Sequence, residues 1–400
     1  MSLKYTPGNE IDLTIERIVP RGYGIGFAEG LTVFVPLAVA GDRLRVRLVE
    51  VKKKIAFARI VVVNEASRDR IDAPCGYFGR CGGCNFQQMN YAAQLKAKSA
   101  IISDCLQRIG KIDIDNVKVL PSPVEFAYRS KTRFHADRAT KTIGYFARDS
   151  HDVVDVTNCP ILTPETDSAL GYLRTGLDWE MLLNDSVEID AASDGEHVSI
   201  HSNDLAEVPS ELKTNAAGFE FLYSAESFFQ ANRPFIDKLV ETAIGGASGK
   251  LALDLYCGVG LFALPLSKHF EHVIGVEDNS AAVTFAERNA ARAGIANAEF
   301  HSQRVKNFLF ENDAIKPDLI LIDPPRAGAE RGTIERIIRI RPRELSYVSC
   351  EPSILARDLR MLMDAGYAIS SIVGLDLFPQ THHVETVVRL NIDAGETFGR

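Results

Sequence analysis

Between residues 226 and 395, short apolar runs alternate with helical stretches such as NSAAVTFAERNAARAG at 279–294. Strands separated by helices predict a doubly wound, mostly parallel sheet of the Rossmann-like α/β type. Ligands of such sheets bind in a crevice at the carboxyl ends of the strands. The expected strands are 251–256, 272–277, 319–323, 345–350, 369–378 and 385–390.

Three acidic residues lie at strand ends of this sheet, where a ligand would bind. Asp254 begins the glycine turn DLYCGVG, Glu277 ends HVIGVE, and Asp323 precedes two prolines in LILIDPPRAG. A dinucleotide enzyme would have a third glycine where this chain has Ala263. An acidic crevice suits S-adenosylmethionine, which has no phosphates but carries a cationic sulfonium and an amine. Glu277 could accept both ribose hydroxyls. The turn alone leaves an NAD-dependent dehydrogenase open, and the DPPR string disfavours it.

Two strings near the C-terminus supply a candidate nucleophile and a candidate base. Cys350 ends an apolar strand in YVSCEPSILARDL, and a cysteine placed there can act as a nucleophile. Glu385 lies near His382, His383 and Thr386 in LDLFPQTHHVETV, where burial would raise its pKa toward the working range of a base. A nucleophile, a base and a cofactor turn in one domain predict covalent group transfer.

The seven cysteines include a set that could bind a metal. An odd number in a chain without an apolar signal core argues against a disulfide framework. Four thiolates can hold a tetrahedral zinc ion or complete an iron–sulfur cluster, and the spacing leaves both open, although the loop glycines favour the bulkier cluster. The candidate ligands, from CGYFGRCGGC and TNCPIL, are Cys75, Cys81, Cys84 and Cys159.

The chain before this sheet divides into two further regions. Residues 1–63 contain short alternating strands with turns at RGYGIG and AGDR, which predict a five-stranded, OB-like barrel of a kind often used on RNA. Residues 64–220 predict a mixed α+β central domain that holds the cysteine site, and residues 221–400 the catalytic domain. The central region should contain a helix at 91–109, strands at 131–137, 141–147 and 151–156, and further strands within 182–225.

The motif strings together resemble the RNA uracil-5-methyltransferases, and the resemblance covers nearly the whole chain. Residues 1–63 are similar to the TRAM domain, and SAESFFQANRP at 224–234 resembles the segment that enters the family's catalytic domain. The resemblance implies S-adenosylmethionine-dependent methylation of uracil C5, with the Cys350 thiolate attacking C6 and Glu385 removing the C5 proton. The residues implied to form the cofactor site are Gln230, Asp254, Tyr256, Gly258, Glu277, Gln303 and Asp323.

The resemblance also implies a second cofactor and a substrate. Family members with a TRAM domain carry the same cysteine spacing and bind a [4Fe-4S] cluster, and this branch generally modifies 23S ribosomal RNA. Two positions depart from the family pattern. Leu261 replaces a polar residue, and Glu351 replaces a common asparagine after the nucleophile, where its charge would raise the pKa of the thiol.

Charge and hydropathy bear on the partners of the chain. A net charge of −8 argues mildly against nucleic acid, but binding depends on local basic patches such as Lys52–Lys54. We expect a monomer that acts on a loop uridine of structured RNA. No run approaches the ~20 apolar residues of a membrane span, and the first residues have no signal core, which predicts a cytoplasmic protein.

Three rival functions use related features. A tRNA uracil-5-methyltransferase would share the chemistry, and some archaeal tRNA enzymes keep the cluster. The 5-methylcytosine enzymes of RNA usually carry their cysteines in TC and PC strings, unlike the SC string at Cys350. A non-catalytic RNA-binding protein on the same fold is disfavoured by the intact Cys350 and Glu385.

Overall fold

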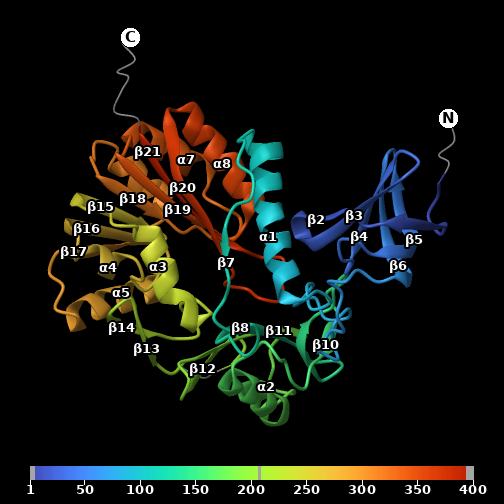
Figure 1. The fold of residues 1–400 in the computed structure, drawn as a ribbon. Helices are drawn as coiled ribbons and strands as arrows, with labels where there is room; N and C mark the ends of the chain where they lie inside the picture. The colour runs from blue at the N-terminus through green and yellow to red at the C-terminus, as the bar shows by residue number, and fades with distance from the viewer. Residues whose placement is uncertain (1–4, 206–208, 393–400) are drawn as a thin grey trace.

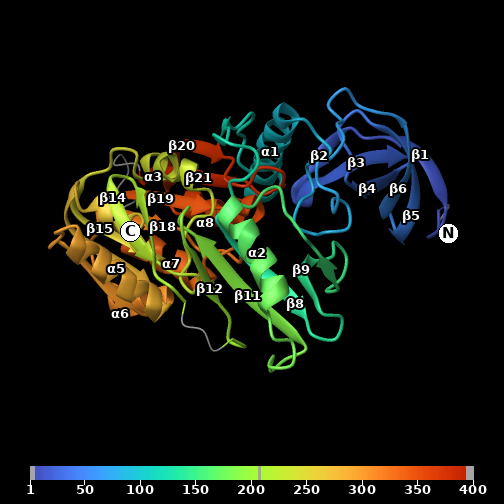
Figure 2. The same ribbon diagram turned by 90° about the horizontal axis from the view of Figure 1, so that it is seen from below.

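The computed structural model describes residues 5–205 and 209–392. The remaining residues, which include the ends of the expected first and last domains, lie outside the described part. A β-barrel lies at one end of the molecule and a large sheet at the other, with a smaller sheet between and below them (Figures 1 and 2). No helix within the described ranges is long and apolar enough to cross a membrane.

The N-terminal barrel has six strands in the order β1-β5-β6-β4-β3-β2, where we expected five. The run IDLTIERIV at 11–19, which reads as one strand, is broken at Ile15 and Glu16, whose amides bond to the carbonyls of Asp42 and Ile25 instead of continuing one ladder. RGYGIG was expected to be a turn, but a 3-10 turn ends at Gly22 and the segment continues as a strand. The strands are β1 (Glu10–Thr14), β2 (Arg17–Val19), β3 (Tyr23–Ala28), β4 (Leu31–Pro36), β5 (Arg43–Lys52) and β6 (Ile55–Glu65).

Glycines in β3 allow the barrel to close tightly. A Cβ atom at Gly24 would lie 2.7 Å from the Cβ of Ala38, and one at Gly26 would lie 2.6 Å from the carbonyl oxygen of Thr14. Any larger residue would push β3 away from the end of β1, so these glycines serve close packing of strands.

A long helix links the barrel to the large sheet. Helix α1 (Tyr91–Cys105) begins at Asn90, whose side chain accepts from the amide of Ala93, and continues as a π-turn to Gly110. The helix expected at 91–109 is therefore confirmed. Strand β7 (Val119–Leu120) then adds to the edge of the large sheet. Both elements precede residue 220 in sequence but pack with the C-terminal part.

The central sheet has the order β10-β9-β8-β11-β12 and is covered by α2 (Pro164–Gly176). All its neighbouring strands are antiparallel. The strands are β8 (Lys131–Asp137), β9 (Thr142–Phe146), β10 (Val153–Asp155), β11 (Ser186–Ser193) and β12 (Val198–His201), and a hairpin of β13 (Leu212–Ala216) and β14 (Phe219–Tyr223) follows.

The C-terminal sheet has eight strands in the order β17-β16-β15-β18-β19-β21-β20-β7. Strands β15 to β19 are parallel, and β21 enters antiparallel between β19 and β20. Its strands are β15 (Gly249–Leu255), β16 (Phe270–Glu277), β17 (Ala298–Ser302), β18 (Leu319–Ile322), β19 (Glu344–Ser349), β20 (Tyr367–Leu375) and β21 (Glu385–Ile392).

Helices cover both faces of this sheet, as the doubly wound prediction requires. Alternate residues of β18 enter opposite cores, Leu319 and Leu321 on one side and Ile320 and Ile322 on the other. The first core is closed by α3 (Ile236–Ile244), α4 (Ala263–Leu266) and α5 (Ser280–Arg292). The second is closed by α1, α6 (Val305–Glu311), α7 (Arg331–Ile340) and α8 (Pro352–Asp364).

Candidate active site at the carboxyl ends of the large sheet

Asp254 is a buried carboxylate without a protein partner at the end of β15. It is completely buried, and neither of its oxygens has a hydrogen-bond partner among the described residues. Burial raises its pKa well above the usual range, and the charges of Asp323 and Glu277 add to the rise. A buried carboxylate in this state fits a cationic ligand, such as the amine of S-adenosylmethionine.

The glycine turn and Glu277 hold each other in place. The amide of Gly258 donates to Glu277 Oε2 at 3.1 Å, and the amide of Asn279 donates to Oε1 at 2.9 Å. Gly258 has a φ of +54°, and a Cβ there would meet only open space near the carbonyl of Phe228. The turn thus fixes a carboxylate at the end of β16, where it can reach a ribose.

Asp323 and Gln230 face each other across the crevice. Gln230 is nearly fully buried, and its Nε2 lies 3.5 Å from Asp323 Oδ2. Burial raises the pKa of Asp323 to about 7. The carboxyl therefore gains and loses its proton near neutral pH, which suits a group that contacts a charged ligand or an N–H of a base.

Tyr256 and Gln303 directly follow β15 and β17 at the carboxyl ends of the sheet. Tyr256 has a φ of +67° and lines a pocket of about 300 Å³ together with Arg304, Lys306 and Glu330. Gln303 donates its backbone amide to the Glu277 carbonyl, but its side chain is only half-buried and donates to Glu311. The structure therefore brings the Gln303 backbone, and not its side chain, to the site.

Cys350 and Glu385 lie at the same end of neighbouring antiparallel strands. The ladder of β19 and β21 ends with the pair Ser349 and Thr386, so Cys350, just after β19, and Glu385, the first residue of β21, flank the same end of that ladder. Burial raises the pKa of the Cys350 thiol to about 12, and the charge of Glu385 is the second cause. Glu351 also raises it, but it is the weakest of the causes.

Glu385 is buried with its Oε1 lacking a hydrogen-bond partner in the described chain. Burial raises its pKa well above the usual range, and the charge of Asp323 adds to this, while Arg326 lowers it. Arg326 also lowers the pKa of Cys350. The two groups and Asp323 thus form one electrostatic unit, in which Arg326 supplies the opposing charge. The sequence analysis did not single out Arg326, although it follows the two prolines of the DPPR string.

The loop between β20 and β21 is tied to α1 and to the cysteine loop. Lys98, on the buried face of α1, forms an ion pair with Asp376, and both side chains are completely buried. Lys98 also donates to the carbonyl of Phe378 at 3.0 Å. Gln94 and Gln380 exchange two bonds of 3.0 Å. A lysine among apolar helix positions is a signal of such a pair that the sequence analysis overlooked.

Asn85, which directly follows Cys84 in the cysteine loop, bonds to the same loop between β20 and β21. Its Oδ1 accepts from the backbone amide of His382 at 2.8 Å, and its Nδ2 lies 2.7 Å from His382 Nδ1. The amides of Asn85 and Phe86 both donate to the Gln380 carbonyl. Burial lowers the pKa of His382 to about 4 and that of His383 to about 2, so both rings are neutral at physiological pH.

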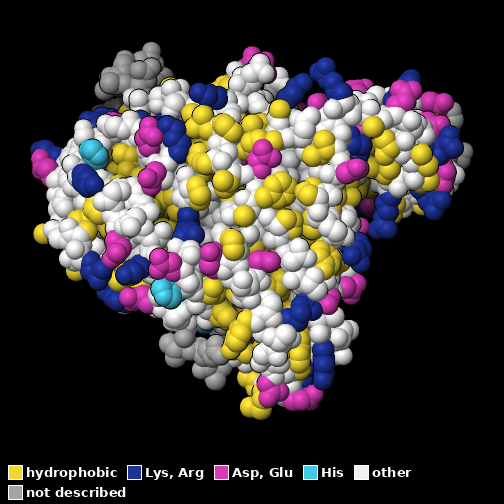
Figure 3. All heavy atoms as spheres, turned by 60° about the horizontal axis from the view of Figure 1, so that its bottom comes forward, with side chains coloured by type: hydrophobic (Ala, Val, Ile, Leu, Met, Phe, Trp, Pro, Cys, Tyr) yellow, Lys and Arg dark blue, Asp and Glu magenta, His cyan; other side chains and the backbone are white. Residues whose placement is uncertain are grey.

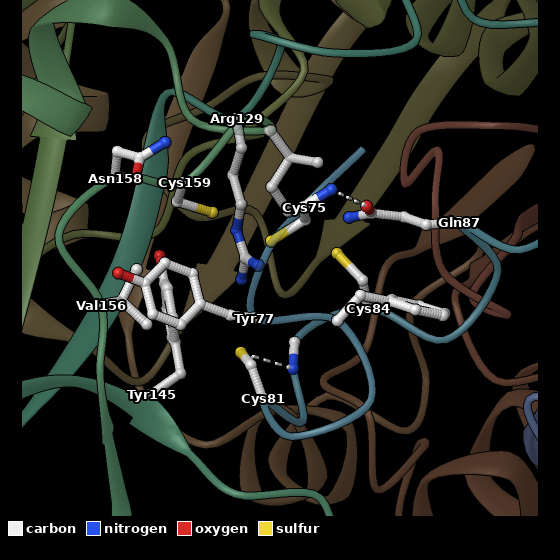
Figure 4. Close-up of a pocket in the computed structure, with 13 residues that line it drawn as sticks. Cys75, Tyr77, Cys81, Cys84, Gln87, Arg129, Tyr145, Val156, Asn158 and Cys159 are labelled. Atoms are coloured by element: carbon white, nitrogen blue, oxygen red, sulfur yellow. Dashed lines mark hydrogen bonds between the residues drawn. The ribbon is translucent and has the colours of Figure 1, made fainter. Parts of the chain in front are cut away.

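The cysteine loop and Cys159 meet at one pocket. Figure 4 shows the sulfur atoms of Cys75, Cys81, Cys84 and Cys159 around a common space, with Arg129 beside them. Burial raises the pKa of the Cys84 thiol to about 12 and that of the Cys159 thiol to about 11. Within the described ranges, no three His, Cys, Asp or Glu side chains are grouped so that they could hold a metal ion.

Two protein families match this chain, one over the N-terminal barrel and one over the C-terminal part. The profile of the family described as tRNA (Uracil-5-)-methyltransferase matches residues 165–392, and that of the TRAM domain matches residues 4–61. An uncharacterized RNA methyltransferase of Halalkalibacterium halodurans is 31% identical, over 98% of this chain and 100% of its own. Another, from Thermosynechococcus vestitus, is 32% identical over 96% and 98%.

A solved structure extends the likeness to three dimensions. The crystal structure of the Pyrococcus abyssi tRNA (uracil-54, C5)-methyltransferase in complex with S-adenosyl-L-homocysteine has a TM-score of 0.72 and is 26% identical. The match covers 94% of this chain and 100% of that chain. The likeness therefore includes the barrel and the central sheet as well as the large sheet.

Proposed function

We propose that this chain, which belongs to the tRNA (uracil-5-)-methyltransferase family and is an S-adenosylmethionine-dependent RNA methyltransferase, methylates C5 of a uridine through a covalent cysteine adduct. The observation that carries the proposal is that Cys350 and Glu385 flank one end of the β19–β21 ladder, close enough for the charge of Glu385 to raise the pKa of the thiol. A nucleophile beside a buried base, next to a carboxylate that can bind a cation, is what this reaction requires.

Cys350 starts the reaction. C5 of uracil is a weak nucleophile, and the Cys350 thiolate activates it by forming a bond to C6. The electrons of the C5–C6 double bond move toward O4, which leaves C5 electron-rich. Because burial holds the pKa of the thiol at about 12 without RNA, loss of the thiol proton depends on the opposing charge of Arg326.

The cofactor residues would hold the methyl donor beside the uracil ring. Asp254 and Asp323 would face the cationic part of S-adenosylmethionine, and Glu277 its ribose hydroxyls, while Gln230 and the Gly258 turn close the crevice. When bound, S-adenosylmethionine would supply the methyl group for the new bond at C5, with its methyl–sulfur bond broken and S-adenosylhomocysteine as the leaving group. We keep Tyr256 and Gln303 as predicted contacts, the latter through its backbone.

Glu385 completes the reaction. Its carboxylate takes the C5 proton, the electrons of that C–H bond re-form the double bond between C5 and C6, and the bond from C6 to the Cys350 sulfur breaks. The thiolate is thereby regenerated. Because the pKa of Glu385 is strongly raised, its carboxylate binds the abstracted proton tightly, and this favours the elimination.

The substrate that we propose is a loop uridine of 23S ribosomal RNA, methylated in the cytoplasm by a monomer. The TRAM domain and the four-cysteine set support this choice through the resemblance. A tRNA substrate is the second candidate, because the matched Pyrococcus abyssi enzyme is a tRNA (uracil-54, C5)-methyltransferase. A looped-out uridine is favoured in both cases, since reaching Cys350 requires leaving the base stack at a cost of a few kcal/mol.

Nucleoside mass spectrometry separates these substrates. Ribosomal RNA and tRNA from a deletion strain are each treated with purified enzyme and S-adenosylmethionine, with Cys350→Ala as the inactive control. We expect 5-methyluridine to appear in 23S fragments and in neither RNA with the control. Methylation of tRNA alone would establish the second candidate, and methylation by Cys350→Ala would refute the covalent mechanism.

We also propose that Cys75, Cys81, Cys84 and Cys159 bind a [4Fe-4S] cluster with a structural role. The four thiols line one pocket, and four thiolates around a common space can complete a cubane cluster. Anaerobically purified protein should be brown and contain about four irons per chain. Cys159→Ser should lose the colour, whereas Cys105→Ser, at a cysteine of the buried core, should keep it. One zinc and no iron would refute this.

A further inference from the structure

The outer face of the barrel carries three aromatic rings in contact with one another. Phe34 and Phe57 are paired in the ladder of β4 and β6, and their rings stack with centroids 5.4 Å apart and an interplanar angle of 25°. Tyr23 on β3 meets these two rings at steep angles, at 6.3 and 6.0 Å. Neighbouring residues on the same strands, Val33 and Ala56, are completely buried in the barrel core, so the rings point outward.

These rings belong to a larger apolar surface that the barrel does not need for its own core. Phe57 is 36% exposed, and the surface continues to Phe27, which is 51% exposed, and Ile55, which is 45% exposed. We call Tyr23, Phe34 and Phe57 the aromatic face. Single exposed apolar side chains are common, but a contiguous group of rings on a small domain marks an interaction surface.

Positive side chains border one side of the aromatic face. Lys53 and Lys54 are exposed in the turn that leads to Ile55, and the carbonyl of Lys54 accepts from Thr32 beside Phe34. Arg59 is exposed two residues after Phe57 on β6. Figure 3 shows hydrophobic side chains on the barrel lobe and Lys and Arg side chains along its lower edge.

The face also leads toward the catalytic part of the molecule. Arg148, which precedes Asp149 in the hairpin of the central sheet, donates its guanidinium to the carbonyl of Cys84 at 2.9 Å. Arg59 forms an ion pair of 3.0 Å with Asp149, which joins β6 to the hairpin of the central sheet. A ligand on the aromatic face would therefore continue onto the loop that contacts His382 through Asn85.

We infer that the aromatic face is a stacking platform for unpaired bases of the RNA substrate, on the strand that flanks the target uridine. Rings that stack on bases, bordered by cations that attract phosphates, are the two features that bind single-stranded RNA without sequence preference. A duplex hides the faces of its bases, so the platform excludes paired RNA. The inference rests on the proposed function in taking RNA as the ligand.

The test compares variants at Phe57 on RNA with and without bases. Phe57→Leu keeps an apolar side chain of similar size but cannot stack, and Phe57→Trp restores a stacking ring. Phe57→Leu should weaken binding of a short oligouridylate by about 5- to 100-fold, and leave binding of an abasic chain of the same length unchanged. Phe57→Trp should bind like the wild type. Phe310→Leu, at a ring that is 64% exposed on α6 far along the chain, is the matched control and should change neither.

The outcomes are distinct. Normal oligouridylate binding by Phe57→Leu, or an equal loss on the abasic chain, would overturn the platform. Tighter binding of a duplex than of oligouridylate, or concentration-dependent association of the protein that Phe57→Leu abolishes, would overturn it too. Methylation is measured on the same preparations: base-dependent binding by an enzyme that methylates no uridine would refute the proposed function and leave the platform standing.

Discussion

Replacing Lys98 by methionine should destabilise the protein severely, because it removes one half of a completely buried ion pair. Both Lys98 and Asp376 have no exposed side-chain surface, and Lys98 also holds the carbonyl of Phe378. Truncating one partner of such a pair leaves a buried charge without compensation and costs about 3–5 kcal/mol. For a domain of 150–250 residues that corresponds to a fall in Tm of roughly 6–20 °C.

Thermal unfolding with two controls tests this reasoning. Arg360→Met removes a pair with Asp364 whose side chains are about half exposed, 48% and 56%, and should cost at most about 1 kcal/mol. The double variant Lys98→Met/Asp376→Asn removes both buried charges and should recover most of the loss. If Lys98→Met unfolds at the same temperature as Arg360→Met, or if the double variant is no better than the single one, the pair does not have the desolvated character that its burial implies.

Three further predictions follow from the site. Because the pKa of the Cys350 thiol is about 12, its alkylation by iodoacetamide without RNA should accelerate about tenfold per pH unit from pH 7 to 10; a plateau near pH 8.5 in peptide mass spectrometry would contradict it. Asp323, with a pKa of about 7, is protonated below that value and charged above it, so affinity for cationic S-adenosylmethionine should rise from pH 6 to 8 in calorimetry, while neutral 5′-methylthioadenosine shows little change. Asn85→Ala removes the side-chain contacts with His382 and should lower kcat about tenfold with little change in S-adenosylmethionine affinity. The reason is that one such bond to a buried group is worth about 1–3 kcal/mol. An unchanged kcat would show that the loop keeps its position without Asn85.

The catalytic sheet was predictable because its information is local. Each strand of 251–256, 272–277 and 319–323 ends in a polar residue before a turn, and parallel strands bring those ends to one edge. The strand β17, AEFHS at 298–302, was missed because its composition is polar and it lies at the edge of the sheet. The helix α2 was also missed, although Thr163 and Pro164 form an ordinary helix start.

The ties between distant segments could not be predicted from local patterns. Asn85 and His382 are 297 positions apart, and Lys98 and Asp376 are 278 apart. Nothing in the sequence around Asn85 indicates its partner, because an asparagine after a cysteine loop is equally compatible with a turn exposed to water. The same holds for the aromatic face. LTVFVP is apolar at every second position and nearly so at the others, and the pairing register alone shows that Phe34 points outward while Val33 and Val35 point inward.

The departure at Glu351 shows how a substitution next to the nucleophile can be compatible with the reaction. We expected its charge to raise the pKa of the neighbouring thiol, and it does, but less than burial, Glu385 or Asp323. The reason lies in the direction of the carboxylate, whose Oε1 accepts from the amide of Ser353 at 3.4 Å and from its hydroxyl at 2.6 Å. Glu351 is the residue that caps α8, and the positive end of that helix attracts the negative charge away from the thiol. The side chain at position 351 therefore serves mainly to cap α8. Any residue whose side chain can accept a hydrogen bond from an amide in the first turn of α8 meets that requirement without taking part in the chemistry at Cys350.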